Sequence, residues 1–177
     1  MSQYYYIVAS LPFLSFDTEK TIETDEYLDL CRRQASQKDY DLLQSASFEQ
    51  LLYKNYTNRV LNTVSQWEKT LRNELAVLRS QKMGIETQDA VSAENIPEAK
   101  EAAREAFNQS YPLQGELTLM HSRWDLYEEL EVNYFFEIEK LILYYLKLQL
   151  LERKALFQKE YGKEQFDQIY ESIVSVE

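Results

Sequence analysis

Between residues 53 and 78 the sequence places an apolar residue at every third or fourth position. This spacing, about 3.6 residues per step, is the period of one face of an α-helix, and so long a face needs a long partner helix. Ser47 and Gln50 have the spacing of a capping box, and Gly84 suits a left-handed helix end. We therefore predict a helix over residues 47–84, about 54 Å long. The stripe consists of Tyr53, Tyr56, Val60, Val64, Trp67, Leu71, Leu75 and Leu78.

A second helical period runs through residues 116–159, where we predict the longest helix of the chain. Around residues 134–151 apolar side chains occur on nearly every side, which predicts a helix packed on several faces. Its main stripe consists of Leu117, Met120, Trp124, Tyr127, Leu130, Tyr134, Ile138, Leu141, Tyr145, Leu148 and Leu151.

Shorter elements complete the chain. Residues 4–11 suit a strand, a short helix or an extended arm, since no second strand is evident to pair with them. Residues 24–36 predict a helix capped by Thr24, and a short helix around residues 38–44 follows. Pro97 begins a surface helix rich in alanine and glutamate, residues 111–115 break the chain again, and residues 163–174 predict a final amphipathic helix.

Glycine and proline are too scarce for a fold built on many tight turns, since each occurs only 3 times in 177 residues. We predict an all-α fold, an elongated helical bundle with two long helices and short satellite helices, whose N-terminal segment is extended or a short helix. The chain forms a single helical domain over residues 1–177. Its parts are an N-terminal arm or short element (1–23), a first helical part (24–84), a loop and surface helix (85–115), and a long aromatic helix with a C-terminal helix (116–177).

The sequence offers little for catalysis. It has no glycine-rich phosphate loop and no HExxH pair, and His121 is its only histidine, so we expect no catalytic residue, cofactor or metal. A net charge of −11 disfavours nucleic acid as a partner. Cys31 stands alone and is expected to be a buried structural thiol. The N-terminus has no signal-peptide pattern and charges interrupt residues 132–151, so we expect a cytoplasmic protein without direct membrane insertion.

One acidic group raises the question of a metal site. Asp125, Glu128 and Glu129 share a helical face, with Glu131 close by, and such carboxylates can bind a divalent cation. We favour a solvated helix face, because like charges at this spacing cost only a few tenths of a kcal/mol each and are tolerated there. We propose no catalytic dyad, because paired carboxylates for acid and base catalysis need a pocket that separates their pKa values, which a sequence does not reveal. A metal-dependent helical enzyme is kept as an alternative.

Aromatic residues are concentrated in the second long helix. Trp and Tyr dominate the energetics of protein interfaces, so each is either part of the internal core or a contact for a partner. We also expect Arg153 to pair with a carboxylate. The candidate framework or interface residues are Trp124, Tyr127, Tyr134, Phe135, Tyr144, Tyr145 and Arg153.

Two segments resemble a bacterial family encoded within V-type (A/V-type) ATPase gene clusters. The first is YYYIVASLPFLSFD, residues 4–17. The second, residues 123–173, is RWDLYEELEVNYFFEIEKLILYYLKLQLLERKALFQKEYGKEQFDQIYESI. The opening Tyr-Tyr-Tyr and SLP, the LYYLKLQLLER run and the late Tyr-Gly carry the resemblance.

That family is similar in turn to the C (also called d) subunit of V-type ATPases, an all-helical funnel between the membrane c-ring and the central rotor shaft. The resemblance implies a non-catalytic component or accessory factor that grips the end of the shaft in an apolar, aromatic-lined socket. Its partners would be the other V/A-type ATPase subunits, which would hold it peripherally on the inner membrane. The chain is shorter than that funnel and lacks a threefold internal repeat, so an accessory, regulatory or truncated version fits this hypothesis as well. The alternatives are a peripheral-stalk or assembly component of the same complex and an unrelated helical adaptor.

Overall fold

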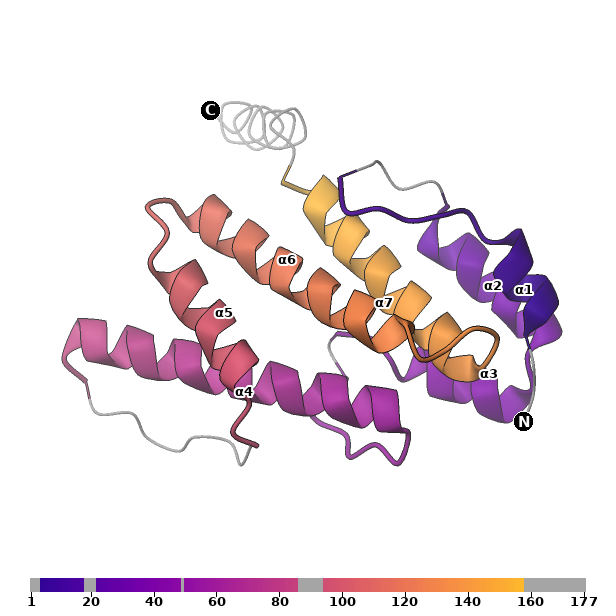
Figure 1. Cartoon of the computed structure of the whole chain (residues 1–177), viewed down its shortest axis with the longest axis horizontal. Coiled ribbons are helices and arrows are strands. Elements are labelled where there is room, and N and C mark those ends of the chain that lie inside the picture. The colour runs from indigo at the N-terminus through magenta and orange to yellow at the C-terminus, as the bar shows by residue number, and fades with distance from the viewer. Residues whose placement is uncertain (1–3, 18–21, 49, 86–93, 158–177) are drawn as a thin grey trace, which may run out of the picture.

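The computed structural model describes residues 4–17, 22–48, 50–85 and 94–157. Within these ranges the protein contains seven helices and no strand, which confirms the predicted all-α class (Figure 1). The helices are α1 (Tyr5–Ser10), α2 (Thr24–Gln34), α3 (Gln37–Gln44), α4 (Arg59–Met83), α5 (Pro97–Phe107), α6 (Pro112–Glu131) and α7 (Ile138–Ala155).

Helix α7 lies at the centre of the larger core. It is packed on one flank by α6 and on the other by α2 and α3, while α1 lies against α2 (Figure 1). Residues 141–148 are all buried, which matches the prediction that apolar residues on every side mean packing on several faces. The long α4 extends away from this group and is covered there by α5, which also contacts α6 (Figure 1).

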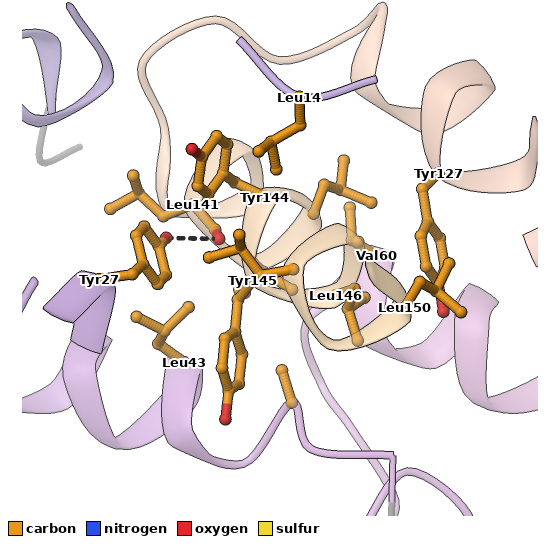
Figure 2. Packing of buried hydrophobic residues seen from close by; sticks show 14 of the residues in the cluster. Leu14, Tyr27, Leu43, Val60, Tyr127, Leu141, Tyr144, Tyr145, Leu146 and Leu150 are labelled. Carbon is orange, nitrogen blue, oxygen red and sulfur yellow. Dashed lines mark hydrogen bonds between the residues drawn. The ribbon is translucent and has the colours of Figure 1, made fainter. Parts of the chain in front are cut away.

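The buried apolar residues form two clusters. The larger joins α1, α2, α3, α6 and α7 with the first turns of α4. In this cluster the Tyr27 hydroxyl donates a hydrogen bond of 2.7 Å to the Leu141 carbonyl, which lies 114 residues away in the sequence (Figure 2). The smaller cluster lies between the later part of α4, α5 and Leu119 of α6, and the alanines Ala99, Ala102, Ala103 and Ala106 form the α5 side. Helix α4 therefore belongs to both clusters.

The first long helix begins later than the sequence predicts. Helix α4 starts at Arg59, and the Asn58 side chain accepts a hydrogen bond of 3.2 Å from the Leu61 N–H. The prediction of a capping box at Ser47 is wrong. The Ser47 backbone carbonyl, and not its side chain, accepts the N–H of Gln50 in a turn. The other end was predicted correctly, since Gly84 ends α4 in the left-handed region with φ 67°.

The start of the predicted stripe changes accordingly. Tyr53 and Tyr56 precede α4, and Tyr53 is 86 % exposed. Tyr56 is half-buried and donates a hydrogen bond of 2.8 Å to the Ser45 carbonyl, which fixes the turn before the helix. From Val60 onwards the stripe faces inward as predicted, and Leu78 is half-buried.

The prediction of one continuous helix over residues 116–159 is also wrong, because residues 132–137 separate α6 from α7. The Glu137 carboxylate accepts the N–H groups of Phe135 and Phe136, both at 2.9 Å, and so stabilises a non-helical connection. The Tyr4 N–H donates to the Phe136 carbonyl at 2.6 Å, which gives this connection a partner from the N-terminal segment.

Thr24 is not a cap but the first residue of α2, where Glu23 holds the capping position. The break predicted over residues 111–115 is too long, because α6 already begins at Pro112, and a Cβ on Gly115 in its first turns would approach the Ala106 carbonyl oxygen to 2.9 Å. Residues 4–11, left open between strand, helix and arm, contain the short helix α1. The predicted helix over residues 163–174 lies outside the described residues.

Candidate protein-interaction site

The candidate framework aromatics fall into three groups. Trp124, Tyr127, Tyr144 and Tyr145 are buried in the larger cluster, and three of them appear in Figure 2. Tyr134 is half-buried at the edge of that cluster. Phe135 is 65 % exposed in the connection between α6 and α7.

The sequence neighbour of Phe135, Phe136, is half-buried and contacts the exposed Tyr5 of α1, and we call Tyr5, Tyr6, Phe135 and Phe136 together the aromatic patch. The ring centroid of Tyr5 lies 5.7 Å from that of Tyr6 and 5.1 Å from that of Phe136. Tyr6 is 83 % exposed and Tyr5 is 55 % exposed. Aromatic residues are enriched at protein interfaces, so this group is a candidate contact surface.

Phe135 is one of the interface residues predicted from the sequence, whereas Tyr5 and Tyr6 are not among them. The available signal was the run of tyrosines at residues 4–6, because consecutive residues on a helix point about 100° apart and cannot all face one core. Here Tyr4 is buried while the next two residues point outward. Once α1 is helical, exposed tyrosines are unavoidable.

The connection that carries Phe135 is fixed by charge as well as by packing. Backbone hydrogen bonds from Phe135 and Phe136 lower the pKa of the Glu137 carboxyl, so this side chain stays ionised and keeps accepting them. These hydrogen bonds hold the backbone of Phe135 and Phe136, the two patch residues in this connection.

A second feature is a cavity of about 470 Å³ between α4, α6 and α7, which we call the arginine pocket. Its lining combines apolar residues with several arginines and two glutamates. The lining residues are Phe48, Glu68, Leu71, Arg72, Leu75, Ala76, Arg79, Glu116, Leu119, Arg123, Leu150 and Arg153.

A buried ion pair lies at the inner side of the arginine pocket. Arg123 donates to both carboxylate oxygens of Glu68, whose side chain is only 3 % exposed, and one of these bonds measures 3.1 Å. Burial alone would lower the pKa of Arg123, but the adjacent Glu68 outweighs it and raises that pKa, so the pair stays ionised. Arg72 reaches the same carboxylate at 3.8 Å.

The outer side of the arginine pocket is less neutralised. Arg153 has a carboxylate partner, as predicted. It is Glu116, at 3.2 Å, and both side chains are at least one-third exposed. Arg79 forms no ion pair within the described part of the chain. Four arginines and two glutamates thus line the pocket, a local excess of positive charge on a strongly acidic protein.

The acidic group considered as a metal site serves a different purpose. Glu131 accepts a hydrogen bond of 2.6 Å from the buried Lys147, and Glu128 lies 3.8 Å from the same ammonium. Lys147 also lies 4.9 Å from the ring centroid of Trp124, while Asp125 and Glu129 are exposed. No group of three or more His, Cys, Asp or Glu side chains that could hold a metal ion occurs among the residues with described positions.

Cys31 and His121 are the two remaining side chains of types that are common in catalytic sites. Cys31 is fully buried, and burial raises the pKa of its thiol to about 11 despite the opposing hydrogen bond with Tyr27. A thiol with so high a pKa is a poor nucleophile at neutral pH. His121 is exposed, and its ring lies 3.9 Å from that of Phe16.

The described part of the chain is thus an all-α protein with an aromatic patch at its surface and a pocket lined by four arginines. In the described ranges no helix has the length and apolar character needed to cross a membrane. Comparison of the chain with family models, with curated proteins and with solved structures gives no match.

Proposed function

We propose that the protein is a non-catalytic component or accessory factor of a V/A-type ATPase, a coupler between the central rotor shaft and the membrane c-ring that is similar to the C (or d) subunit. In this role it is held on the cytoplasmic face of the inner membrane by the complex. One observation supports the proposal most directly. The two segments that resemble the ATPase-cluster family, residues 4–17 and 123–173, contribute contacting residues from their described parts and together form the aromatic patch.

The physical basis of this role is binding without chemistry. Exposed tyrosine and phenylalanine rings are strong interface anchors because each buries a large apolar area at a low cost in side-chain entropy. A coupler must also resist deformation, and the patch stands on the packed α6–α7 hairpin, whose buried Lys147 joins the two helices through Glu131.

The same hairpin bears on the alternative of a peripheral stalk. A stalk built as a coiled coil needs helices with a narrow apolar seam. Helix α7 is instead buried on all sides over residues 141–148, and α6 and α7 are joined by a short connection. This geometry favours a compact coupler over an extended stalk.

The test is affinity purification of the tagged protein from its native cell in mild detergent, followed by mass spectrometry. We expect recovery of the catalytic subunits together with shaft and c-ring proteins. A protein that is recovered alone, or with unrelated soluble partners, would exclude the ATPase assignment.

A double variant tests whether the aromatic patch is the surface that contacts the ATPase. Tyr6→Ala with Phe135→Ala should reduce recovery of the complex at least tenfold, since central interface aromatics contribute about 2 kcal/mol or more each. The matched control is Phe13→Ala with Tyr53→Ala, which removes two aromatics that are 87 % and 86 % exposed outside the patch and should leave recovery unchanged. Equal recovery with both double variants would mean that the ATPase binds elsewhere.

A further inference from the structure

We propose that the arginine pocket binds a short acidic, amphipathic segment of a partner protein, which places one apolar side chain on the floor and its carboxylates on the rim arginines. The inference concerns a different surface from the aromatic patch and does not depend on the ATPase assignment.

The floor of the pocket is apolar and already formed. Leu71, Leu75, Leu119 and Leu150 line it, and because they are 0–8 % exposed, the apolar area that they present to the cavity is small. The cavity volume of about 470 Å³ lies in the range of roughly 300 to 1,000 Å³ that is typical of ligand pockets. Ala76, which is small and not buried, leaves the floor open to solvent and so to an incoming side chain.

The rim selects for negative charge. Arg72 and Arg153 have side chains that are 54 % and 56 % exposed, and each has only one carboxylate near it among the described residues. Arg79, one of the lining residues, has no ion-pair partner in the described ranges. Arginine binds carboxylates through two parallel hydrogen bonds, so three such groups around one cavity can hold more than one carboxylate.

Charge complementarity also makes the pocket selective. The protein carries a net charge of −11, so most of its surface repels an acidic segment. The arginine pocket reverses this repulsion locally. The buried Glu68–Arg123 pair keeps its own charges neutralised and leaves the rim arginines to face the partner.

The surroundings favour a peptide carboxylate over a phosphate. Phosphate sites in proteins draw on free backbone N–H groups at helix N-termini or in glycine-rich loops. The pocket residues of α4 lie within the body of a 25-residue helix, whose N–H groups are already used in helical hydrogen bonds. An apolar floor contributes nothing to phosphate binding, whereas it adds burial energy for a leucine or phenylalanine side chain.

Fluorescence anisotropy with a labelled model peptide of alternating Glu-Glu-Leu-Leu units tests the proposal on the full chain. We expect saturable binding that weakens with added salt. Arg72→Gln with Arg79→Gln should weaken binding about tenfold or more, as expected for lost charge-assisted hydrogen bonds. The control Arg32→Gln with Arg33→Gln makes the same change in net charge at two exposed positions of α2 and should leave binding within about twofold.

A further variant occupies the pocket from within. Ala76→Glu introduces a carboxylate one helical turn from Arg72 and from Arg79, where it supports the helix rather than disturbing it. We expect this variant to keep the thermal stability of the original protein and to lose most of its peptide binding. Peptide binding at full strength by Ala76→Glu would overturn the proposal.

Four other results would also overturn it. These are no saturable binding by the unaltered protein, equal weakening in the α2 control, equal affinity for a peptide with Gln in place of Glu, and displacement of the peptide by an equal concentration of inorganic phosphate, which would make the pocket a small-anion site. Displacement by a synthetic peptide of residues 158–177 would assign the pocket to an acidic segment of the chain itself instead of a partner. Each outcome is independent of whether the ATPase is recovered in the purification.

Discussion

Two buried tyrosines differ in what their hydroxyl groups do. The Tyr27 hydroxyl donates to the Leu141 carbonyl, whereas the Tyr127 hydroxyl, fully buried, has no hydrogen-bond partner among the described residues. Burial and the nearby charge of Glu68 raise the pKa of Tyr127, so this hydroxyl stays protonated. A buried polar group without a partner costs free energy.

This contrast predicts opposite effects of the same substitution. Tyr27→Phe should lower the free energy of unfolding by about 1 kcal/mol, because it removes a made hydrogen bond. Tyr127→Phe should leave it unchanged or raise it, because it removes an unsatisfied group and keeps the ring. Urea unfolding of the two variants measures both values, and a larger loss for Tyr127→Phe would mean that the Tyr127 hydroxyl is hydrogen-bonded after all.

Glu131 gives a pH-dependent prediction at the same scale. Burial would raise its pKa, but hydrogen bonds from Lys140 and Lys147 outweigh burial and lower it in the folded state. The stabilisation is therefore complete above the unfolded-state pKa of about 4.3 and is lost as the pH falls through the folded-state value.

Glu131→Gln should reduce stability at pH 7 by about 3 kcal/mol, because Lys147 remains buried with only the more distant Glu128. It should also flatten the decline in stability between about pH 5 and pH 3. Thermal unfolding across this range compares the variant with Glu129→Gln, an exposed neighbour that should behave like the unaltered protein. Equal pH profiles for both variants would contradict the role given to Glu131.

At the scale of helices, two residues, Asn58 and Ser47, can be compared as candidate N-caps of α4. Asn58→Ala should cost about 1 kcal/mol, since the Asn58 side chain accepts the Leu61 N–H and also donates to Glu139 at 2.9 Å. Ser47→Ala should cost little, because the Ser47 backbone carbonyl makes the turn. Urea unfolding of both variants checks this order, and the reverse order would place the helix start at Ser47.

The helices also show which features a sequence can predict. The inward stripe of α4 from Val60, its end at Gly84 and the start of α5 at Pro97 follow from local rules of spacing and capping. The break between α6 and α7 does not, because the apolar period continues through it and neither glycine nor proline marks it. The non-helical backbone between the two helices is held by hydrogen bonds with the Glu137 carboxylate and with the N–H of Tyr4, which is distant in the sequence.

The same reason limits the prediction of sites. The arginine pocket takes its charged residues from α4, α6 and α7, which are far apart in the sequence, so no motif announces it. Arg153 was expected to have a carboxylate partner, but which one depends on how α6 packs on α7. Spacing along one helix cannot supply that information.

For the whole molecule, the two clusters predict unequal local stability. The smaller cluster holds eight buried residues among those described, and four are alanines, which bury little apolar area. Amide protons of α5 should therefore exchange with solvent faster than those of the central turns of α7. Native-state hydrogen exchange measured by mass spectrometry tests this, and equal protection would mean that the two clusters open as one unit.

The central place of α7 has a consequence for how the chain acquires its structure during synthesis. Tyr144 and Lys154 bind the carbonyls of Pro12 and Phe16, and Tyr27 binds that of Leu141, over sequence separations of 132, 138 and 114 residues. Helices α2 and α3 leave the ribosome early, yet the helix that packs against both is the last of those described to be made. Until α7 emerges, the apolar faces of α2 and α3 lack the helix that covers them, so we expect the nascent chain to be more prone to aggregation than the finished protein.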